Sequence, residues 1–125
     1  MTERLLRAIE HPALTILGHP TGRLLLSREP YGLDYERVFA RCAERGVALE
    51  INGDPHRLDL DWRLVRQARG AGVRFAIGAD AHGPEGIGNM EMALWMARKA
   101  GLTAMDVVNT RSVDGFLQLA RRRRS

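Results

Sequence analysis

Residues 74–83 have the sequence RFAIGADAHG, and the fold and chemistry of the chain are best inferred from them. An apolar run typical of a buried β-strand ends at a glycine and is followed by a carboxylate and an imidazole two residues apart. In an extended backbone, side chains at i and i+2 lie on one face, so Asp80 and His82 are placed to approach the same ion. Their oxygen and nitrogen atoms are ligands for zinc, manganese or iron. The alternative is a turn in which Asp80 caps the next helix and His82 is an ordinary surface histidine.

The composition is typical of one globular domain. The chain has 125 residues, 45% of them hydrophobic, which is enough for one core of ordinary size. No apolar run approaches the roughly 20 residues that cross a bilayer, and no signal peptide is recognisable. The single cysteine, Cys42, excludes an internal disulfide and fits a reducing compartment. We therefore expect a cytoplasmic protein without membrane contact.

The formal net charge of +4 resides in the last residues of the chain. Without Arg121, Arg122, Arg123 and Arg124, 15 basic side chains face 15 acidic ones. A basic run of this kind can bind nucleic-acid phosphates at low salt, but a solvated terminus has the same composition. We treat residues 121–125 as a basic tail that follows a domain over residues 1–120.

Hydrophobic periodicity predicts strands and helices in alternation. In the strand after Gly46, Glu50 and Asn52 share one face, whereas Leu49 and Ile51 share the other. Thr2 and Ser112 are expected to cap helices, and Asp34 is expected to begin one. Alternation with short loops indicates an α/β fold with parallel strands, curved into a barrel or laid open. The predicted strands are 13–17, 47–52 and 73–77; the predicted helices are 3–9, 34–45, 60–71, 87–100 (with Ile87, Met90, Leu94 and Ala97 on one buried stripe) and a last one from Ser112 to Ala120.

Polar residues follow each of the three strands. Gly18-His19-Pro20 ends the first, Glu50-Ile51-Asn52 ends the second, and the Asp80/His82 pair ends the third. Because the carboxyl ends of parallel strands meet at one mouth, His19, Asp80 and His82 are expected to converge there. Two imidazoles and a carboxylate suffice for one metal ion with an open coordination position. Such an ion makes hydroxide available near neutral pH, which favours hydrolysis.

Basic residues near the same mouth are candidate anion contacts. Arg57, and with weaker support Arg23 and His56, are candidates to bind an anionic group beside the metal, because guanidinium groups pair bidentately with phosphate oxygens. Each of them, taken alone, is more typical of a solvated loop residue.

Three motifs, in this order and spacing, resemble the C-terminal part of a PHP (polymerase and histidinol phosphatase) domain. They are GHP at 18–20, ALEINGDPHRLDL at 48–60 and GADAH at 78–82. The most similar version is the one attached to bacterial family X DNA polymerases, and the similarity covers residues 2 to about 119. Free-standing PHP phosphatases share the motifs, so they indicate the superfamily better than the member.

The resemblance implies a distorted, TIM-like β/α barrel with a trinuclear metal centre and metal-dependent phosphoesterase activity. In family X polymerases this activity is a manganese-favouring 3′–5′ exonuclease with 3′-end processing, which serves DNA repair. By motif, His19, Asp80 and His82 match metal ligands. Glu50 and Asn52 match a motif beside the metals, where they could contact substrate with Arg23, and His56 and Arg57 lie in a loop near the substrate as catalytic candidates.

The chain also departs from the family pattern. PHP domains begin with an H-x-H strand and further ligands, and none of these precedes His19 here. We therefore expect about half a barrel, which self-associates or needs the N-terminal half of the domain. The alternatives are a histidinol-phosphate-type phosphatase, a catalytically silent fragment or interaction module, and non-specific DNA binding by the arginine tail.

Overall fold

Three parallel strands form the sheet of the computed structural model, which describes residues 1–124 and, for 122–124, the backbone alone. The strands are β1 (Ile16–Leu17), β2 (Ala48–Asn52) and β3 (Phe75–Gly78), and they lie side by side in that order. Ile16 is in register with Ala48, and Asn52 is in register with Gly78. The predicted α/β class with parallel strands is confirmed.

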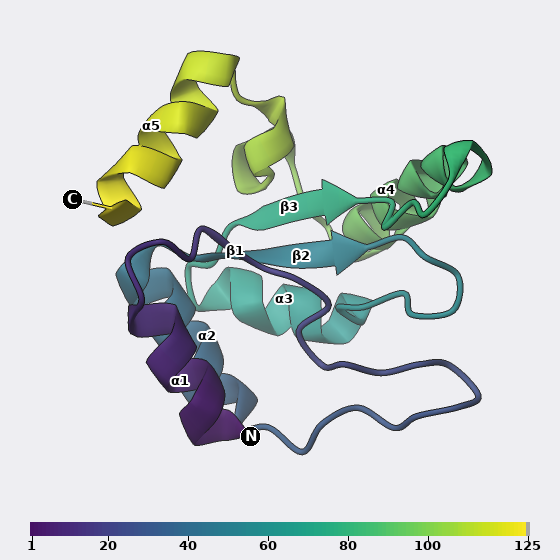
Figure 1. The fold of residues 1–125 in the computed structure, drawn as a ribbon, viewed down its shortest axis with the longest axis horizontal. Coiled ribbons are helices and arrows are strands. Elements are labelled where there is room, and N and C mark those ends of the chain that lie inside the picture. Colours follow the sequence, from purple (N-terminus) through teal and green to yellow (C-terminus); the bar gives the residue numbers. More distant parts are fainter. Residues whose placement is uncertain (125) are drawn as a thin grey trace.

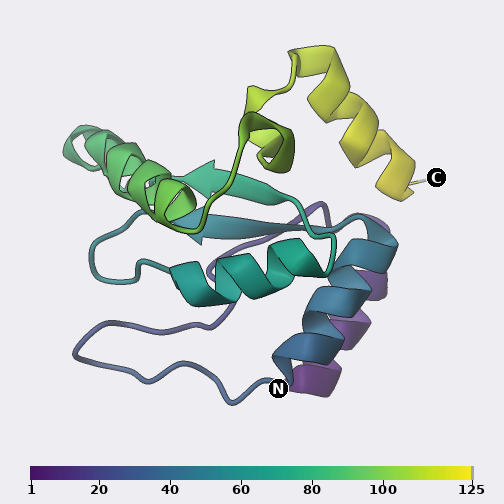
Figure 2. The ribbon, with the colours of Figure 1, turned by 180° about the vertical axis from the view of Figure 1, so that it is seen from behind.

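The helices lie on both faces of this sheet (Figure 1), and the view from behind shows the same arrangement (Figure 2). Helix α3 packs on one face, beside α1 and α2, whereas α5 lies across the opposite face. The α-helices are α1 (Thr2–Glu10), α2 (Tyr35–Arg45), α3 (Trp62–Gly70), α4 (Met90–Lys99) and α5 (Val113–Arg124). Short 3-10 helices are η1 (Pro84–Asn89), η2 (Ala104–Asp106) and η3 (Val108–Thr110).

The alternation of side chains along β2 divides the interior into two cores. Leu49 and Ile51 are fully buried in the larger core, with apolar residues of α1 to α4. Ala48 points the other way, into a smaller core completed by Ala76, Val108 and Phe116. Glu50 and Asn52 continue the face of Ala48 toward the carboxyl end of the strand. Polar side chains therefore occupy the end of a face whose beginning is apolar.

The predicted cap at Ser112 and the predicted helix start at Asp34 are confirmed. The Asp34 side chain accepts a hydrogen bond from the Arg37 amide at the start of α2, and Ser112 Oγ accepts one from the Gly115 amide at the start of α5. The predicted Thr2 cap is wrong, because Thr2 lies inside α1 and Met1 is its N-cap. The Thr2 hydroxyl instead accepts a hydrogen bond from the Asp34 amide, 3.0 Å away, and ties α1 to the start of α2.

The prediction for the helix after residue 86 is partly wrong. The segment begins as the 3-10 helix η1, and α4 starts only at Met90. Ile87, Met90 and Leu94 are exposed, and the buried side chains of α4 are Ala93 and Ala97. Small residues face the sheet here because α4 approaches closely. A Cβ at Gly53 would lie 2.1 Å from the Asn89 carbonyl oxygen.

The described residues form an open sheet, consistent with part of a β/α barrel but without closure. No helix among the described residues has the length and apolar character needed to span a membrane. The backbone of α5 continues to Arg124, so most of the basic tail extends this helix. The side chains of residues 122–125 lie outside the described part, and the tail remains a prediction.

Candidate functional site

A fully buried amide side chain joins polar groups at the carboxyl end of the sheet. Asn52, the last residue of β2, donates through Nδ2 to Asp80 Oδ2 at 3.0 Å and to Glu50 Oε2 at 3.4 Å. Its Oδ1 accepts from the Asp54 amide at 2.9 Å. The predicted convergence of the β2 and β3 ends is therefore present in the structure.

Glu50 extends this network to the end of β1. Its Oε2 accepts a hydrogen bond from the His19 amide at 2.7 Å, although 31 residues separate the two. The Glu50 side chain has room because position 78 on β3, two residues beyond its register partner Ala76, is a glycine. A Cβ at Gly78 would lie 2.8 Å from Glu50 Oε1. The backbone of His19 is thus fixed to β2, while its imidazole belongs to an exposed residue.

Asp80 and His82 follow β3 in a tight turn. Asp80 has a positive φ of 54°, which aspartate tolerates better than most residues. The turn places His82 Nδ1 2.7 Å from the Asp80 carbonyl oxygen. If Nδ1 carries the proton, as this contact favours, Nε2 of His82 presents its lone pair outward. The Asp80 side chain is about a quarter exposed, so solutes can reach it.

The loop after β2 brings Arg57 to Asp80. Arg57 Nε lies 3.7 Å from Asp80 Oδ2, and both side chains are largely buried. His56 points elsewhere. Its amide and its Nδ1 both contact Asp54 Oδ1, at 2.8 and 2.9 Å, and its side chain is 84% exposed. Of the two catalytic candidates, the structure places only Arg57 against the D-x-H pair.

Arg23 is engaged in holding two loops together. Its Nε donates to the Arg57 carbonyl oxygen at 2.8 Å, its Nη2 donates to the Leu58 carbonyl, and its Nη1 lies 3.8 Å from Asp61 Oδ2. Arg57 Nη1 contacts the Arg23 carbonyl oxygen in return, at 3.4 Å. The contacts of Arg23 therefore support the loop that carries Arg57.

A buried carboxylate lies beneath these loops. Asp59 is fully buried and accepts hydrogen bonds from the amides of Thr21 and Gly22, at 3.0 and 3.1 Å. Burial raises the pKa of the Asp59 carboxyl, against the effect of these donors and of nearby Arg23. By contrast, the Arg63 side chain lowers the pKa of Asp61, and the His56 amide lowers that of Asp54.

The three predicted metal ligands do not form a closed site by themselves. Among the described residues, no group of three or more His, Cys, Asp and Glu side chains is positioned to hold a metal ion. The imidazole and carboxylate groups suit manganese or zinc chemically, and the strand ends bring their backbones together.

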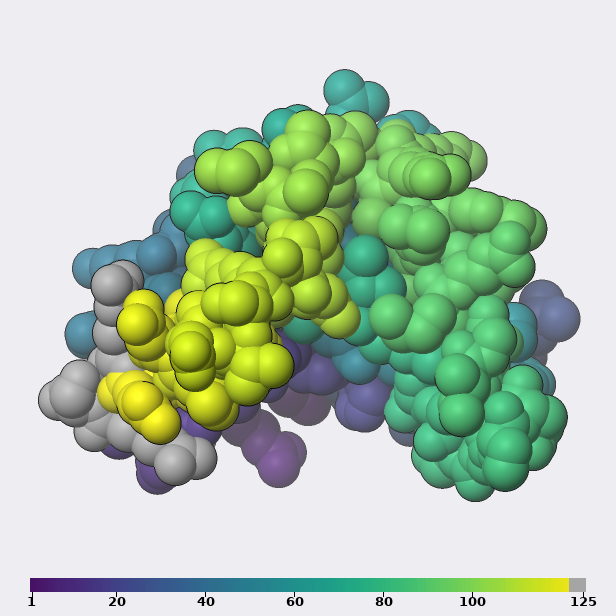
Figure 3. Space-filling model, turned by 90° about the horizontal axis from the view of Figure 1, so that it is seen from above, coloured from purple at the N-terminus to yellow at the C-terminus, as the bar shows by residue number. Residues whose placement is uncertain are grey.

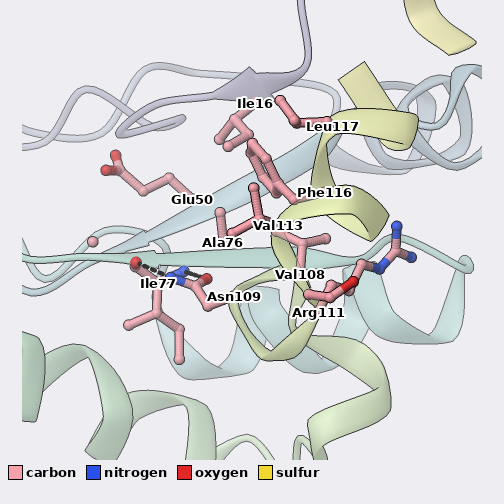
Figure 4. Close-up of a pocket in the computed structure, with 12 residues that line it drawn as sticks. Ile16, Glu50, Ala76, Ile77, Val108, Asn109, Arg111, Val113, Phe116 and Leu117 are labelled. Carbon is pink, nitrogen blue, oxygen red and sulfur yellow. Dashed lines mark hydrogen bonds between the residues drawn. The ribbon is translucent and has the colours of Figure 1, made fainter. Parts of the chain in front are cut away.

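A pocket of about 430 Å³ adjoins the network on the face covered by α5. Glu50 and Gly78 line one end, and its apolar part is formed by Ile16, Ala76, Val113, Phe116 and Leu117. In Figure 4 the carboxylate of Glu50 points away from these apolar side chains. Seen from above, α5 lies to one side of a hollow, across from α4 (Figure 3). The polar strand ends and the apolar sheet face are therefore continuous.

Sequence reasoning missed the supporting residues Asp54 and Asp59. Both lie in the segment GDPHRLD, which carries part of the family resemblance and whose only residues with a predicted role are His56 and Arg57. The Asp-Pro pair is a turn signal, and it identifies Asp54 as a residue that caps backbone amides. No sequence signal indicated that Asp59 would be buried.

The chain is similar in sequence to several named proteins. The chain is 34% identical over 119 residues to the DNA polymerase/3′-5′ exonuclease PolX of Bacillus subtilis (strain 168), which covers 93% of the chain but 21% of that protein. It is 30% identical over 115 residues to a probable phosphatase of Thermoanaerobacter sp. (strain X514), covering 87% of the chain and 44% of the relative. A probable phosphatase of Aliivibrio fischeri (strain ES114) is 32% identical over 127 residues, with 93% and 47% coverage.

No protein-family model matches the chain. The chain spans about a fifth of the polymerase relative and less than half of the phosphatase relatives. These similarities are consistent with a fragment of a PHP-type domain.

Proposed function

We propose that this chain is part of a PHP phosphoesterase domain of the kind attached to family X DNA polymerases, and that the complete domain cleaves phosphate esters at DNA 3′ ends. One observation carries the proposal. Hydrogen bonds connect the ends of three parallel strands: Glu50 accepts from the His19 amide and from Asn52 Nδ2, and Asn52 Nδ2 also donates to Asp80. The similarity to a polymerase/exonuclease supports the DNA-directed version.

In this proposal, His19, Asp80 and His82 contribute to a divalent metal site for manganese, zinc or iron, and ligands from the rest of the domain complete it. The metal would supply a nucleophilic hydroxide and stabilise charge on the phosphate. Arg57 is proposed to contact a phosphate oxygen, because its guanidinium already lies beside Asp80 at the strand ends. Glu50 and Asn52 hold this arrangement in place.

The remaining strands of the domain are proposed to pair with β1. Within the described residues, β1 pairs only with β2, so its other edge has no strand partner. Exposed strand edges promote association with further strands. Either the N-terminal half of a PHP domain or a second copy of this chain would satisfy that edge. Size-exclusion chromatography of the isolated chain distinguishes a self-associated form from a monomer.

A second candidate is a small-molecule phosphatase of the histidinol-phosphate type. Several relatives are named probable phosphatases, and the chain spans 44–48% of the length of three of them. The residues at the strand ends would have the same roles, and only the substrate would differ.

Hydrolysis assays on a completed domain test both candidates. The chain would be joined to the N-terminal half of a PHP domain, with Asp80→Ala as the inactive control. We expect manganese-dependent release of nucleotides from a 3′-recessed duplex and little hydrolysis of histidinol phosphate. The opposite preference would favour the phosphatase, and no Asp80-dependent hydrolysis of either substrate would contradict the phosphoesterase proposal.

A further inference from the structure

Asn52 has a different environment from a substrate-binding residue. Its exposed fraction is 0%, and both of its side-chain polar atoms have partners within the chain. Its backbone amide also donates to the Asp59 carbonyl oxygen at 2.6 Å. A substrate could bind the Asn52 amide only by displacing Asp80, Glu50 or Asp54. The side chain is therefore committed to structure at the strand ends.

The surroundings require an amide at this position. Two carboxylate oxygens, from Asp80 and Glu50, face Nδ2, and a backbone N–H, from Asp54, faces Oδ1. The two ends of the side chain thus need opposite hydrogen-bonding character, and the network fixes its orientation. An aspartate at position 52 would place a third carboxylate beside those of Asp80 and Glu50. An alanine would leave these carboxylates and the Asp54 amide without the hydrogen bonds that Asn52 makes.

Three separate segments meet on this one side chain. Asp80 connects it to the turn after β3, Asp54 connects it to the loop that carries Arg57, and Glu50 connects it to the amide of His19 after β1. These segments contain every residue that we propose to contact metal or phosphate. A shift of Asn52 would therefore move all of them together.

We propose that Asn52 is a positioning residue that sets the relative placement of the three strand ends. This proposal has two parts. The functional part, an effect of Asn52 on catalysis, rests on the proposed phosphoesterase activity. The structural part, the placement of the strand ends by Asn52, concerns the isolated chain. Because Asn52 acts through Asp80 and the Arg57 loop, losing it should affect turnover more than substrate affinity. Misplacement of reacting groups by about 1 Å can reduce rates on the order of 10²-fold.

The structural part is tested by NMR on the 125-residue chain. In Asn52→Ala we expect the amide resonances of His19, Asp54 and His82 to shift, while those of Val65 and Ala68 in the core of α3 stay in place. Changes confined to the immediate neighbours of residue 52 would overturn the proposal. This experiment does not depend on catalysis, so it remains informative if the proposed function fails.

Exchange of donor and acceptor provides a control for general damage. Asn52→Asp alone should lower the melting temperature by several degrees, because three carboxylates then meet. The Asn52→Asp/Asp80→Asn double variant restores a hydrogen bond between the two positions and should regain much of that loss. If the double variant melts no higher than Asn52→Asp, the hydrogen bond between positions 52 and 80 does not hold the strand ends together, which contradicts the positioning role.

The functional part is tested by kinetics on the completed domain. We expect Asn52→Ala to lower kcat on the order of 10²-fold with KM nearly unchanged. A raised KM with an unchanged kcat would instead identify Asn52 as a substrate-binding residue and overturn the positioning role. Inactivity of the parent domain on both substrates would count against the proposed function while leaving the NMR result to decide the structural role.

Discussion

The buried carboxylate of Asp59 accepts a hydrogen bond from the backbone amide of Thr21 at 3.0 Å, across 38 residues of sequence. This contact joins the segment after β1 to the loop after β2. Arg23 reinforces the same junction through the carbonyl oxygens of Arg57 and Leu58. The position of Arg57 beside Asp80 therefore depends on a carboxylate that does not itself reach the site.

Asp59 should give the stability of the chain a specific pH dependence. Burial raises its pKa above the ordinary value of 3.8, so the folded protein holds this proton more tightly than the unfolded chain. Its favourable contribution is complete below about pH 3.8 and is lost as the pH rises through the folded pKa. Relative to Asp59→Asn, the wild-type free energy of unfolding should fall over this range. Urea unfolding at several pH values measures the difference.

Equal pH slopes for wild type and Asp59→Asn would contradict the assignment of the raised pKa to Asp59.

Gly78→Ala should disturb the contact between Glu50 and His19. The new methyl group would lie 2.8 Å from Glu50 Oε1 and would push the carboxylate away from the sheet. Overpacking of this kind costs about 1–3 kcal/mol of unfolding free energy. Gly88→Ala is the matched control, because nothing lies within 4 Å of its Cβ position. Thermal unfolding and hydrogen exchange would be measured, and we expect the His19 amide to exchange faster in Gly78→Ala because it loses its hydrogen bond to Glu50. Identical behaviour of both variants would contradict the close packing.

Gly53→Ala should be more damaging than Gly78→Ala, because its Cβ would meet a rigid backbone atom. That position is 2.1 Å from the Asn89 carbonyl oxygen, so η1 and α4 must move away from β2. We expect a loss of about 3 kcal/mol, at the upper end of overpacking effects. Gly32→Ala, which has no atom within 4 Å of its Cβ position, should change stability little. A tolerated Gly53→Ala in denaturant unfolding would argue against the observed approach of α4.

Arg57→Ala should reduce phosphoesterase activity of the completed domain without unfolding it. Removing one group that stabilises charge in a transition state typically costs 10²–10³ in kcat, and we expect a loss of about that size. Arg66→Ala, on the exposed surface of α3, is the control and should keep full activity. Equal rates for both variants on the 3′-recessed duplex would remove Arg57 from the proposed site.

The parts of the fold that follow from local physics could be predicted from the sequence. Alternating apolar and polar residues at 48–52 located β2 and both of its faces, and Asp34 and Gly46 marked the ends of α2. The prediction of a buried stripe on the helix after residue 86 is partly wrong. Periodicity shows that a helix has an apolar face, but it does not show which face the sheet covers. Ile87 and Leu94 remain exposed, while Ala93 is buried by the close approach of Gly53.

The site could be predicted only at the level of strand ends. The strand ends lie together, as expected for parallel strands, whereas a shared metal site of His19, Asp80 and His82 stays a prediction. The roles within the group depend on contacts between distant segments, such as Glu50 with the His19 amide and Arg23 with the Leu58 carbonyl. No spacing in the sequence encodes these contacts, so the supporting role of Arg23 and the junction at Asp59 became visible only in three dimensions.

Manganese binding to the completed domain tests the central claim most directly. Equilibrium dialysis would compare wild type with Asp80→Ala and with the exposed control Asp114→Ala. If the strand ends of this chain form part of a metal-dependent phosphoesterase site, Asp80→Ala should bind less manganese, while Asp114→Ala should match wild type. Equal manganese uptake by all three proteins would contradict it.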